Sequence, residues 1–357
     1  MGRRALRRRV VLTGVGVVTP ALHGGAAALG RWLAIPADAR PAGTVPDARL
    51  AELIDEAEAR RLSRISRLTI AAARLAVADA GLAAIENAGV VVGTEFGDLR
   101  STVAFADGYL DSGPGGLSAL LFPNTVMNAM AAATTIAVRA EALSLTLTSP
   151  TLAGELAVAR AAALVAAGRV DVALAGGVDE RDAFLETMLG ELGVPGVRGE
   201  GATVLVLEPE ADALARGARV LGEVVATGCR SLRARPHGIG RSPEGRAIAA
   251  ALGEAGLERT AIRWVYHAVD GDPERDAWEE RLLTAAFGDS RPPRAALTPR
   301  LGQHAGGGAL TIAAAADTAR SGRLPTAGGP AVVAPGVGLV HAVARGGTEI
   351  AVVVGPP

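Results

Sequence analysis

The chain has 357 residues, of which 49% are hydrophobic, and a chain of this size and composition can bury one large core or two fused smaller ones. Lys and Arg number 36 against 37 Asp and Glu, so no strong field favours nucleic acid or an anionic membrane as a partner. The single cysteine, Cys229, excludes an intramolecular disulfide and a cysteine-based zinc site, and it suits a reducing cytoplasm.

The N-terminal stretch Met1–Arg9 carries five arginines and precedes the apolar run Val10–Val18, an arrangement that also occurs in secretory signals. Gly14 and Gly16 interrupt this run and Pro20 ends it, so a buried strand that leads into a turn is the better interpretation. Elsewhere no uninterrupted apolar run approaches the roughly 18 residues that a membrane span needs. We therefore expect a cytoplasmic protein without a membrane segment.

Short apolar runs alternate with Ala-rich helical segments along the chain, which predicts an α/β fold with buried strands. In the first part we expect strands at Val10–Val18, Val90–Val92, Leu143–Leu147, Val170–Leu174 and Ala202–Leu207, with helices at Ser66–Ala80 and Gly154–Ala167. The second part repeats the rhythm, with strands at Ala218–Val225, Trp264–His267, Ala331–Ala334, Val337–Val343 and Glu349–Val354, and helices at Pro243–Ala255, Asp276–Phe287 and Gly308–Ala319. The division predicts two α/β halves, residues 10–212 and 213–357, with surface loops at Ile35–Arg49 and Asp107–Gly116.

Several segments, in order, resemble the β-ketoacyl synthases of fatty acid and type II polyketide assembly. They include RRVVLTGVGVVTP near the start, VVVGTEFG at Val90–Gly97, FPNTVMNAMAAATTIAVR from Phe122, GRVDVALAGGVDE ending at Glu180, and EGATVLVLE from Glu200. The resemblance covers almost the whole chain. It implies the thiolase fold, in which two similar α/β halves form a five-layered αβαβα core that is normally dimeric.

Members of that family condense acyl chains through a cysteine at the start of a buried helix, where the helix dipole favours the thiolate. Counting back without gaps from Leu174–Gly177 places this position at Thr151, whose hydroxyl is a poor nucleophile without an adjacent base. We expect a helix cap instead, with Ser149 or Thr151 as the capping residue and Pro150 in the first turn. A nucleophilic threonine is the alternative.

The first family histidine falls on Ala268 when Pro273 and Asp276 are held in register. His267 lies one residue early, which in an extended segment turns its side chain to the opposite face, so a structural or surface histidine is expected there. A metal site of His267, Asp270 and Asp272 lacks a convincing ligand set, and we expect no metal.

The second family histidine falls on Gln303 and the family's lysine on Thr298, while His304 lies one residue late. In the family the two histidines donate hydrogen bonds that assist malonyl decarboxylation, and such groups act as a unit. The loop that gates the acyl pocket in the family is matched to Gly336-Val337-Gly338, with Val337 in the aromatic position. No dinucleotide fingerprint accompanies the glycine pairs, and no cofactor is expected.

One branch of the family has this kind of loss: the chain length factors, which lack the cysteine, pair with an active ketosynthase and shape the tunnel that limits product length. The resemblance therefore predicts a non-condensing subunit, with an active ketosynthase and an acyl carrier protein that carries the acyl or malonyl chain as partners. This chain departs from that branch in having Thr151 where glutamine is frequent and a shorter stretch between Asp179 and Glu200.

The segment around FPNTVMNAM lies near the twofold axis in this family, which makes its residues candidates to face the partner and line a shared tunnel: Phe122, Asn124, Thr125, Met127 and Met130. Two other functions stay open. One is a thiolase-fold acyltransferase or hydrolase that uses Thr151, Ser149, His267 or His304. The other is an inert homodimeric scaffold that binds acyl carrier protein.

Overall fold

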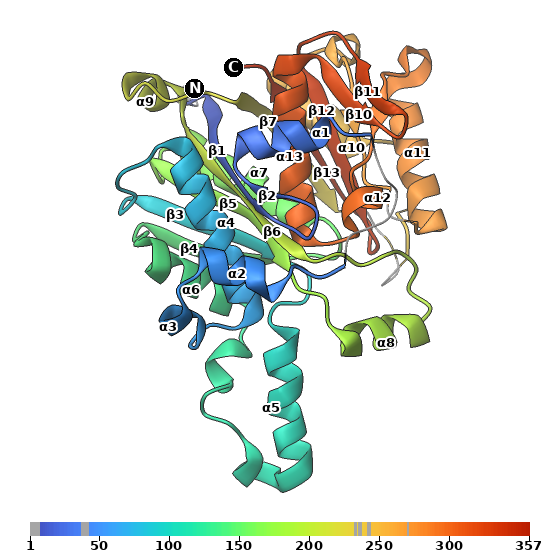
Figure 1. Ribbon diagram of the computed structural model, residues 1–357. Helices are drawn as coiled ribbons and strands as arrows, with labels where there is room; N and C mark the ends of the chain where they lie inside the picture. The colour runs from blue at the N-terminus through green and yellow to red at the C-terminus, as the bar shows by residue number, and fades with distance from the viewer. Residues whose placement is uncertain (1–7, 37–42, 232–233, 235–237, 241–243, 270) are drawn as a thin grey trace, which may run out of the picture.

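The computed structural model describes residues 8–36, 43–231, 234, 238–240, 244–269 and 271–357. Strands from both parts of the chain join in one large mixed sheet, because β1 pairs with β7 over Val10–Leu12. Figure 1 shows helices on both sides of this sheet and a helical arm that projects from the body.

The first five long strands form the N-terminal half of the sheet, in the spatial order β4-β3-β5-β6-β1. The outer three are parallel, whereas β6 runs antiparallel to both of its neighbours. Their bounds are β1 Val10–Val18, β3 Ala88–Thr94, β4 Leu143–Thr148, β5 Val172–Asp179 and β6 Gly201–Pro209.

The C-terminal half repeats the arrangement, with the order β9-β8-β12-β13-β7 and the same pattern of parallel and antiparallel pairs. Its strands are β7 Gly222–Ser231, β8 Val265–Tyr266, β9 Arg294–Ala295, β12 Gly338–Ala344 and β13 Thr348–Gly355. A two-residue strand, β2 (His23–Gly24), pairs with β1, and β10 (Arg323–Thr326) forms a separate hairpin with β11 (Gly329–Val332). The exact division between residues 212 and 213 stays a prediction, although it falls between β6 and β7.

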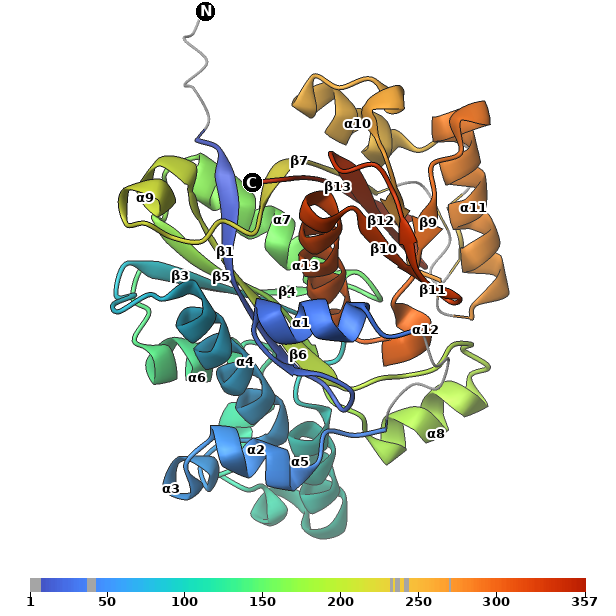
Figure 2. The same ribbon diagram turned by 45° about the horizontal axis from the view of Figure 1, so that its top comes forward.

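The helices make three layers around the two halves of the sheet. On the outside of the N-terminal half lie α4 (Arg64–Ala80) and α6 (Ala129–Val138), and α10 (Arg246–Ala255) and α11 (Pro273–Phe287) pack on the C-terminal half. Between the halves lie α7 (Ala153–Ala166) and α13 (Ala305–Ser321), which contact each other and strands of both halves (Figure 2). The thiolase-like αβαβα fold is therefore confirmed.

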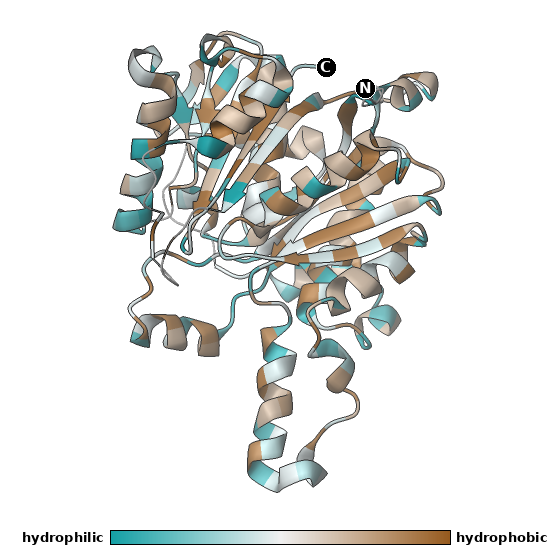
Figure 3. Cartoon of the chain, turned by 180° about the vertical axis from the view of Figure 1, so that it is seen from behind, coloured by the Kyte–Doolittle hydropathy of each residue, from teal (hydrophilic) through white to brown (hydrophobic). Residues whose placement is uncertain are grey.

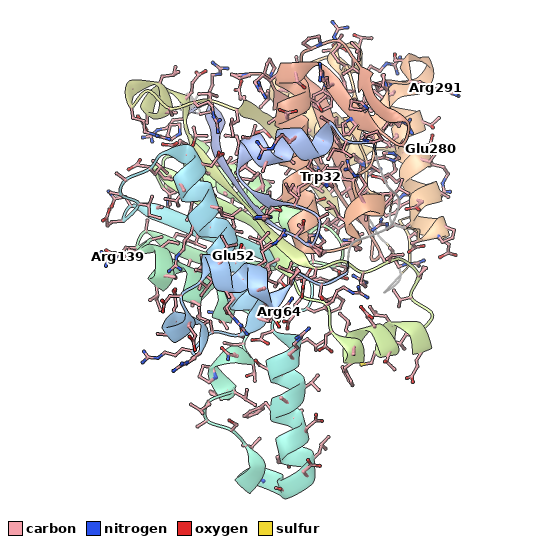
Figure 4. All side chains as sticks on the ribbon, in the orientation of Figure 1. Trp32, Glu52, Arg64, Arg139, Glu280 and Arg291 are labelled. Carbon is pink, nitrogen blue, oxygen red and sulfur yellow. The ribbon has the colours of Figure 1, made fainter. Side chains whose placement is uncertain are left out.

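The remaining helices are shorter or peripheral: α1 Ala26–Leu33, α2 Asp47–Leu53, α3 Glu56–Ala59, α5 Leu99–Ser112, α8 Ala183–Glu191, α9 Glu210–Ala215 and α12 Thr298–Leu301. Arg64, labelled in Figure 4, anchors the start of α4. Its Nη2 lies 2.6 Å from Glu200 Oε2 and its Nη1 lies 2.5 Å from Asp47 Oδ1, so it connects α4 to β6 and α2.

The two central helices approach to backbone contact because glycine stands where they meet. A Cβ atom on Gly154 of α7 would lie 2.0 Å from the Ala305 oxygen, and one on Gly177 of β5 would lie 2.4 Å from it. A Cβ on Gly308 of α13 would lie 2.0 Å from Glu155 Oε2. Side chains at these positions would force the layers apart, so the close crossing requires glycine. The strands on either side are strongly apolar, as the brown colour in Figure 3 shows.

Most expected strands and helices are present, with ends that shift by a few residues. The strand expected at Val170 begins at Val172, and the strand expected at Ala218 begins at Gly222.

The expectation of a loop at Asp107–Gly116 is wrong: these residues form the end of α5 and a 3₁₀ turn at Gly113–Gly116. Asp98 caps α5 by accepting the Ser101 N–H at 3.0 Å, and the helix continues until Gly113, whose φ of 62° ends it. The other expected loop lies partly outside the described residues, and its end begins α2 at Asp47.

Candidate functional site

Thr151 lies in a sharp turn between β4 and α7. Its φ is +60°, a conformation that a β-branched residue rarely adopts and that costs on the order of 1–3 kcal/mol. Its Oγ1 donates a hydrogen bond to the carbonyl oxygen of Val343, 3.2 Å away. The residue before the helix is Leu152, which makes no side-chain cap. The expected cap by Ser149 or Thr151 is therefore wrong, and Pro150 lies before the first turn.

The four positions to which the resemblance assigns the family's reactive groups line one small cavity: Thr151, Ala268, Thr298 and Gln303. The Gln303 amide donates from Nε2 to the Thr151 carbonyl oxygen at 2.9 Å. The free volume of the cavity is about 20 Å³, which is room for about one water molecule. The structure therefore brings the substituted positions together at a site that is filled by the chain itself.

The two histidines next to the family positions, His267 and His304, also line this cavity. Burial lowers the pKa of His304 to about 4, so its ring is neutral at pH 7, and neither ring nitrogen has a hydrogen-bonding partner among the described residues. Burial likewise lowers the pKa of His267, whose Nδ1 lies 4.0 Å from Glu279 Oε2. In the described part of the chain neither histidine is hydrogen-bonded to the Thr151 hydroxyl, which bonds the Val343 carbonyl oxygen instead.

Glu155 is a further residue of the cavity that the sequence did not single out. It lies one turn after Thr151 in α7 and is buried, and its Oε2 has no partner within the described structure. Burial raises the pKa of this carboxyl to about 7. The only signal in the sequence is an isolated acid in an Ala-rich helix.

A second group that the sequence did not single out is a buried charged cluster around His341 of β12. His341 Nδ1 lies 2.8 Å from Glu279 Oε1 of α11, and Nε2 lies 3.2 Å from Glu349 Oε1 of β13. Burial alone would lower the pKa of His341, but the hydrogen bonds and charges of the two carboxylates raise it to about 9. Conversely, burial raises the pKa of Glu279, but the His341 hydrogen bond outweighs it and the net pKa falls.

The sequence cluster His267, Asp270 and Asp272 does not form a metal site in the described residues. Asp270 lies outside them, and Asp272 caps α11 by accepting the N–H groups of Glu274 and Arg275 at 3.2 Å. It also pairs with Arg345, whose Nη2 lies 2.7 Å from Asp272 Oδ1. Over the part of the chain that the structure describes, no three His, Cys, Asp or Glu side chains gather as metal ligands.

The assignment of the gate loop to Gly336, Val337 and Gly338 is wrong. These residues precede or begin β12, where Val337 accepts the Arg263 N–H at 2.9 Å and Gly338 lies against the Trp264 ring. Thr151 contacts the opposite end of β12, at Val343. The turn beside the site is therefore the β12–β13 connection, in which Gly346 and Gly347 have φ of 93° and 88°. Glycine pairs at both ends of β12 made the register ambiguous.

The candidate partner-facing residues fall into two groups. Phe122 and Met127 are 59% and 40% exposed, and Asn124 and Thr125 are half-buried beside them. Met130 is fully buried in the core of its own N-terminal half, so it does not face a partner. Met127 lies in the turn before α6, whereas Met130 lies in the first turn of α6, which packs on α4.

No helix in the described ranges is long and apolar enough to cross a bilayer.

Comparisons with known proteins agree with this geometry. Residues 44–183 match the family model of the β-ketoacyl synthase N-terminal domain. The chain is 28% identical over 330 residues to 3-oxoacyl-[acyl-carrier-protein] synthase 2 of Synechocystis, covering 79% of this chain and 78% of the relative. A synthase of the same name from Staphylococcus aureus is 27% identical over 324 residues, with the same coverage.

Solved structures match over nearly the full length. The ishigamide ketosynthase/chain length factor superposes with a TM-score of 0.87 at 25% identity, covering 98% of this chain and 100% of that one. The ketosynthase AntDE, solved with its type II acyl-carrier protein and bound to the hexaketide, superposes with a TM-score of 0.84 at 17% identity, with the same coverage. With its repeated half-sheets, this chain is similar over most of its length to the β-ketoacyl synthases and has their thiolase-like fold.

Proposed function

We propose that this chain is a non-condensing subunit of the chain length factor type, which pairs with an active ketosynthase in polyketide or fatty-acid-like chain assembly. The observation that carries the proposal is the cavity itself. It keeps the place of the family's reactive site but holds Thr151, Ala268, Thr298 and Gln303, with room for one water. Condensation then depends on the cysteine and histidines of another subunit.

The surface around FPNTVMNAM supports a subunit interface. It belongs to the arm, which we define as residues 99–127, comprising α5, the 3₁₀ turn Gly113–Gly116 and the segment up to Met127. Large apolar side chains of the arm are exposed: Tyr109, Leu110, Leu117, Leu120, Phe122, Val126 and Met127. An apolar surface of this kind on a projecting element is typical of a face that a partner covers.

The enzyme alternative finds less support. The Thr151 hydroxyl donates a hydrogen bond to the Val343 carbonyl oxygen, and His304 is neutral and lies without a partner among the described residues. A nucleophile without a base gives no efficient acyl transfer at neutral pH. In the proposed complex an acyl carrier protein delivers its chain to the cysteine of the active subunit, and this chain needs neither a cofactor nor a metal.

Co-expression with an active ketosynthase from the same organism tests the proposal. The two chains should co-purify, and Met127→Trp should shorten the products, measured by mass spectrometry, without abolishing turnover. Leu214→Trp is the control, because Leu214 is also exposed but lies on α9, far from the arm (Figure 1). A monodisperse homodimer that never captures a ketosynthase, or unchanged products with Met127→Trp, would contradict the proposal.

A second measurement tests the alternative that the chain is itself an acyltransferase or hydrolase. The purified chain, incubated with radiolabelled acyl carrier protein, should form no covalent adduct. A stable acyl group mapped to Thr151 would instead support the acyltransferase or hydrolase.

A further inference from the structure

The charged cluster of Glu279, His341 and Glu349 reaches beyond its own three residues. Besides its contact with His341, Glu279 accepts the Ala268 N–H through both oxygens, at 3.3 and 3.1 Å. Glu349 accepts the Ala247 N–H at the start of α10, at 3.2 Å from Oε2. The cluster therefore connects α10, α11, β12, β13 and the segment after β8, and Ala268 in that segment forms the cavity wall.

We propose that this cluster is an internal charge lock, which holds the wall of the degenerate site against the β12–β13 hairpin and α10 and which weakens when His341 loses its proton. With the imidazolium in place, each carboxylate faces a positive partner inside the protein. Without that charge, two buried carboxylates face one neutral ring, and the desolvation of the anions is no longer offset. The inference concerns the isolated chain and does not depend on the proposed function.

Other titratable groups surround the lock. From α11 the buried Arg275 donates to the Ala268 carbonyl oxygen at 2.5 Å, and its charge favours the ionised form of Glu279. His267, after β8, and Glu155, on α7, face the cluster from the cavity side. On β7, burial and the charge of Glu349 raise the pKa of Cys229. Burial holds His267 towards its neutral form, and Glu155 and Cys229 lie outside the three-residue cluster, so within the cluster His341 is the group whose charge changes above neutral pH.

The direction of the pH dependence follows from the raised pKa of His341. The stability that protonated His341 contributes to the folded chain is fully present below the ordinary histidine pKa of 6.5. It is lost as the pH rises through about 9.

The first experiment is an NMR titration of the full chain labelled in its five histidines. One imidazole, assigned by its absence in His341→Asn, should titrate near pH 9, and Glu349→Gln should move its midpoint downwards because one anionic partner is gone. A His341 midpoint at or below 6.5 in the unaltered chain would overturn the proposal.

The second experiment measures hydrogen exchange at the Ala268 and Ala247 amides, after correction for the intrinsic pH dependence. Both amides should exchange about tenfold faster or more in His341→Asn at pH 7, and in the unaltered chain above pH 9, because their acceptors lose their fixed position. His23→Asn is the control, since His23 is exposed on β2. Equal protection in His341→Asn and the unaltered chain would show that the cluster locks nothing. If His341→Asn does not fold, Glu349→Gln serves for the same comparison at Ala268, whose own acceptor is intact.

Discussion

The cavity around Thr151 and the arm that carries Phe122 differ in almost every physical respect. The cavity is buried, rich in polar and charged groups, and filled by its own chain. The arm is exposed, apolar and has few contacts with the body (Figure 1). We infer from this contrast that the proposed pairing with a ketosynthase uses the arm, where large apolar groups are exposed.

The largest effect should come from changing the arm. Leu110 and Leu120 are 78% and 88% exposed, so Leu110→Asp with Leu120→Asp should fold normally but place two charges in the interface. Capture of the ketosynthase should weaken by about 30-fold or more, as the loss of central apolar contacts costs about 2 kcal/mol. Affinity measured by surface plasmon resonance tests this.

Leu214→Asp on α9 is the control for each substitution, because it introduces one aspartate at a leucine that is 61% exposed elsewhere. Equal affinities for the arm variant and the control would place the interface, and with it the function, somewhere other than the arm.

The next largest effect, a change in stability with pH, is expected in the cavity at Glu155. Because the folded chain raises the pKa of this carboxyl from 4.5 to about 7, the folded state binds its proton more tightly than the unfolded state. The free energy of unfolding should therefore fall as the pH rises from about 4.5 to about 7, by up to about 3 kcal/mol. Urea unfolding of the unaltered chain and of Glu155→Gln at several pH values measures the difference.

Glu155→Gln should remove this part of the pH dependence, whereas Glu52→Gln, at an exposed glutamate of α2 (Figure 4), should leave it unchanged. Parallel pH profiles for the unaltered chain and Glu155→Gln would mean that the cavity is wetter than its geometry indicates.

A smaller effect should come from Thr151, where strain and a hydrogen bond oppose each other. Thr151→Gly removes both and should leave stability unchanged or raise it by about 1 kcal/mol, because glycine adopts a φ of +60° freely. Thr151→Val keeps the strain, loses the bond to Val343, and should lower stability by about 1 kcal/mol. Thermal unfolding of the two variants measures both effects. A Thr151→Val variant more stable than Thr151→Gly would contradict the proposed balance of strain and hydrogen bonding.

The smallest effect is expected at Cys229, which is exposed on β7 and lines neither the cavity nor the arm. Cys229→Ser should change stability by less than about 0.5 kcal/mol and leave ketosynthase capture intact. Loss of capture with folding retained would reveal an interface that neither region includes.

The fold could be predicted because its long strands are nearly continuous apolar runs, as at Val10–Val18, and the family motifs fixed their order. The four substituted positions could be placed for the same reason, since ungapped motifs carried them into one cavity. The charged cluster could not be predicted, because Glu279, His341 and Glu349 lie on three elements and only tertiary packing brings them together. The gate loop could not be assigned correctly from the sequence for a related reason. Glycine pairs flank both ends of β12, and only the contact of Thr151 with Val343 shows which pair lies beside the cavity.

The glycine crossing of α7 and α13 limits how the molecule can respond to a partner. At Gly154 the backbones touch with no side chain between them. No side chain at this contact could therefore repack to give a second arrangement of the two helices. A signal received at the arm would have to move one half against the other as a whole, or bypass the centre. We expect the two halves to behave as one rigid unit, so that a bound ketosynthase meets a surface whose shape is set before the encounter.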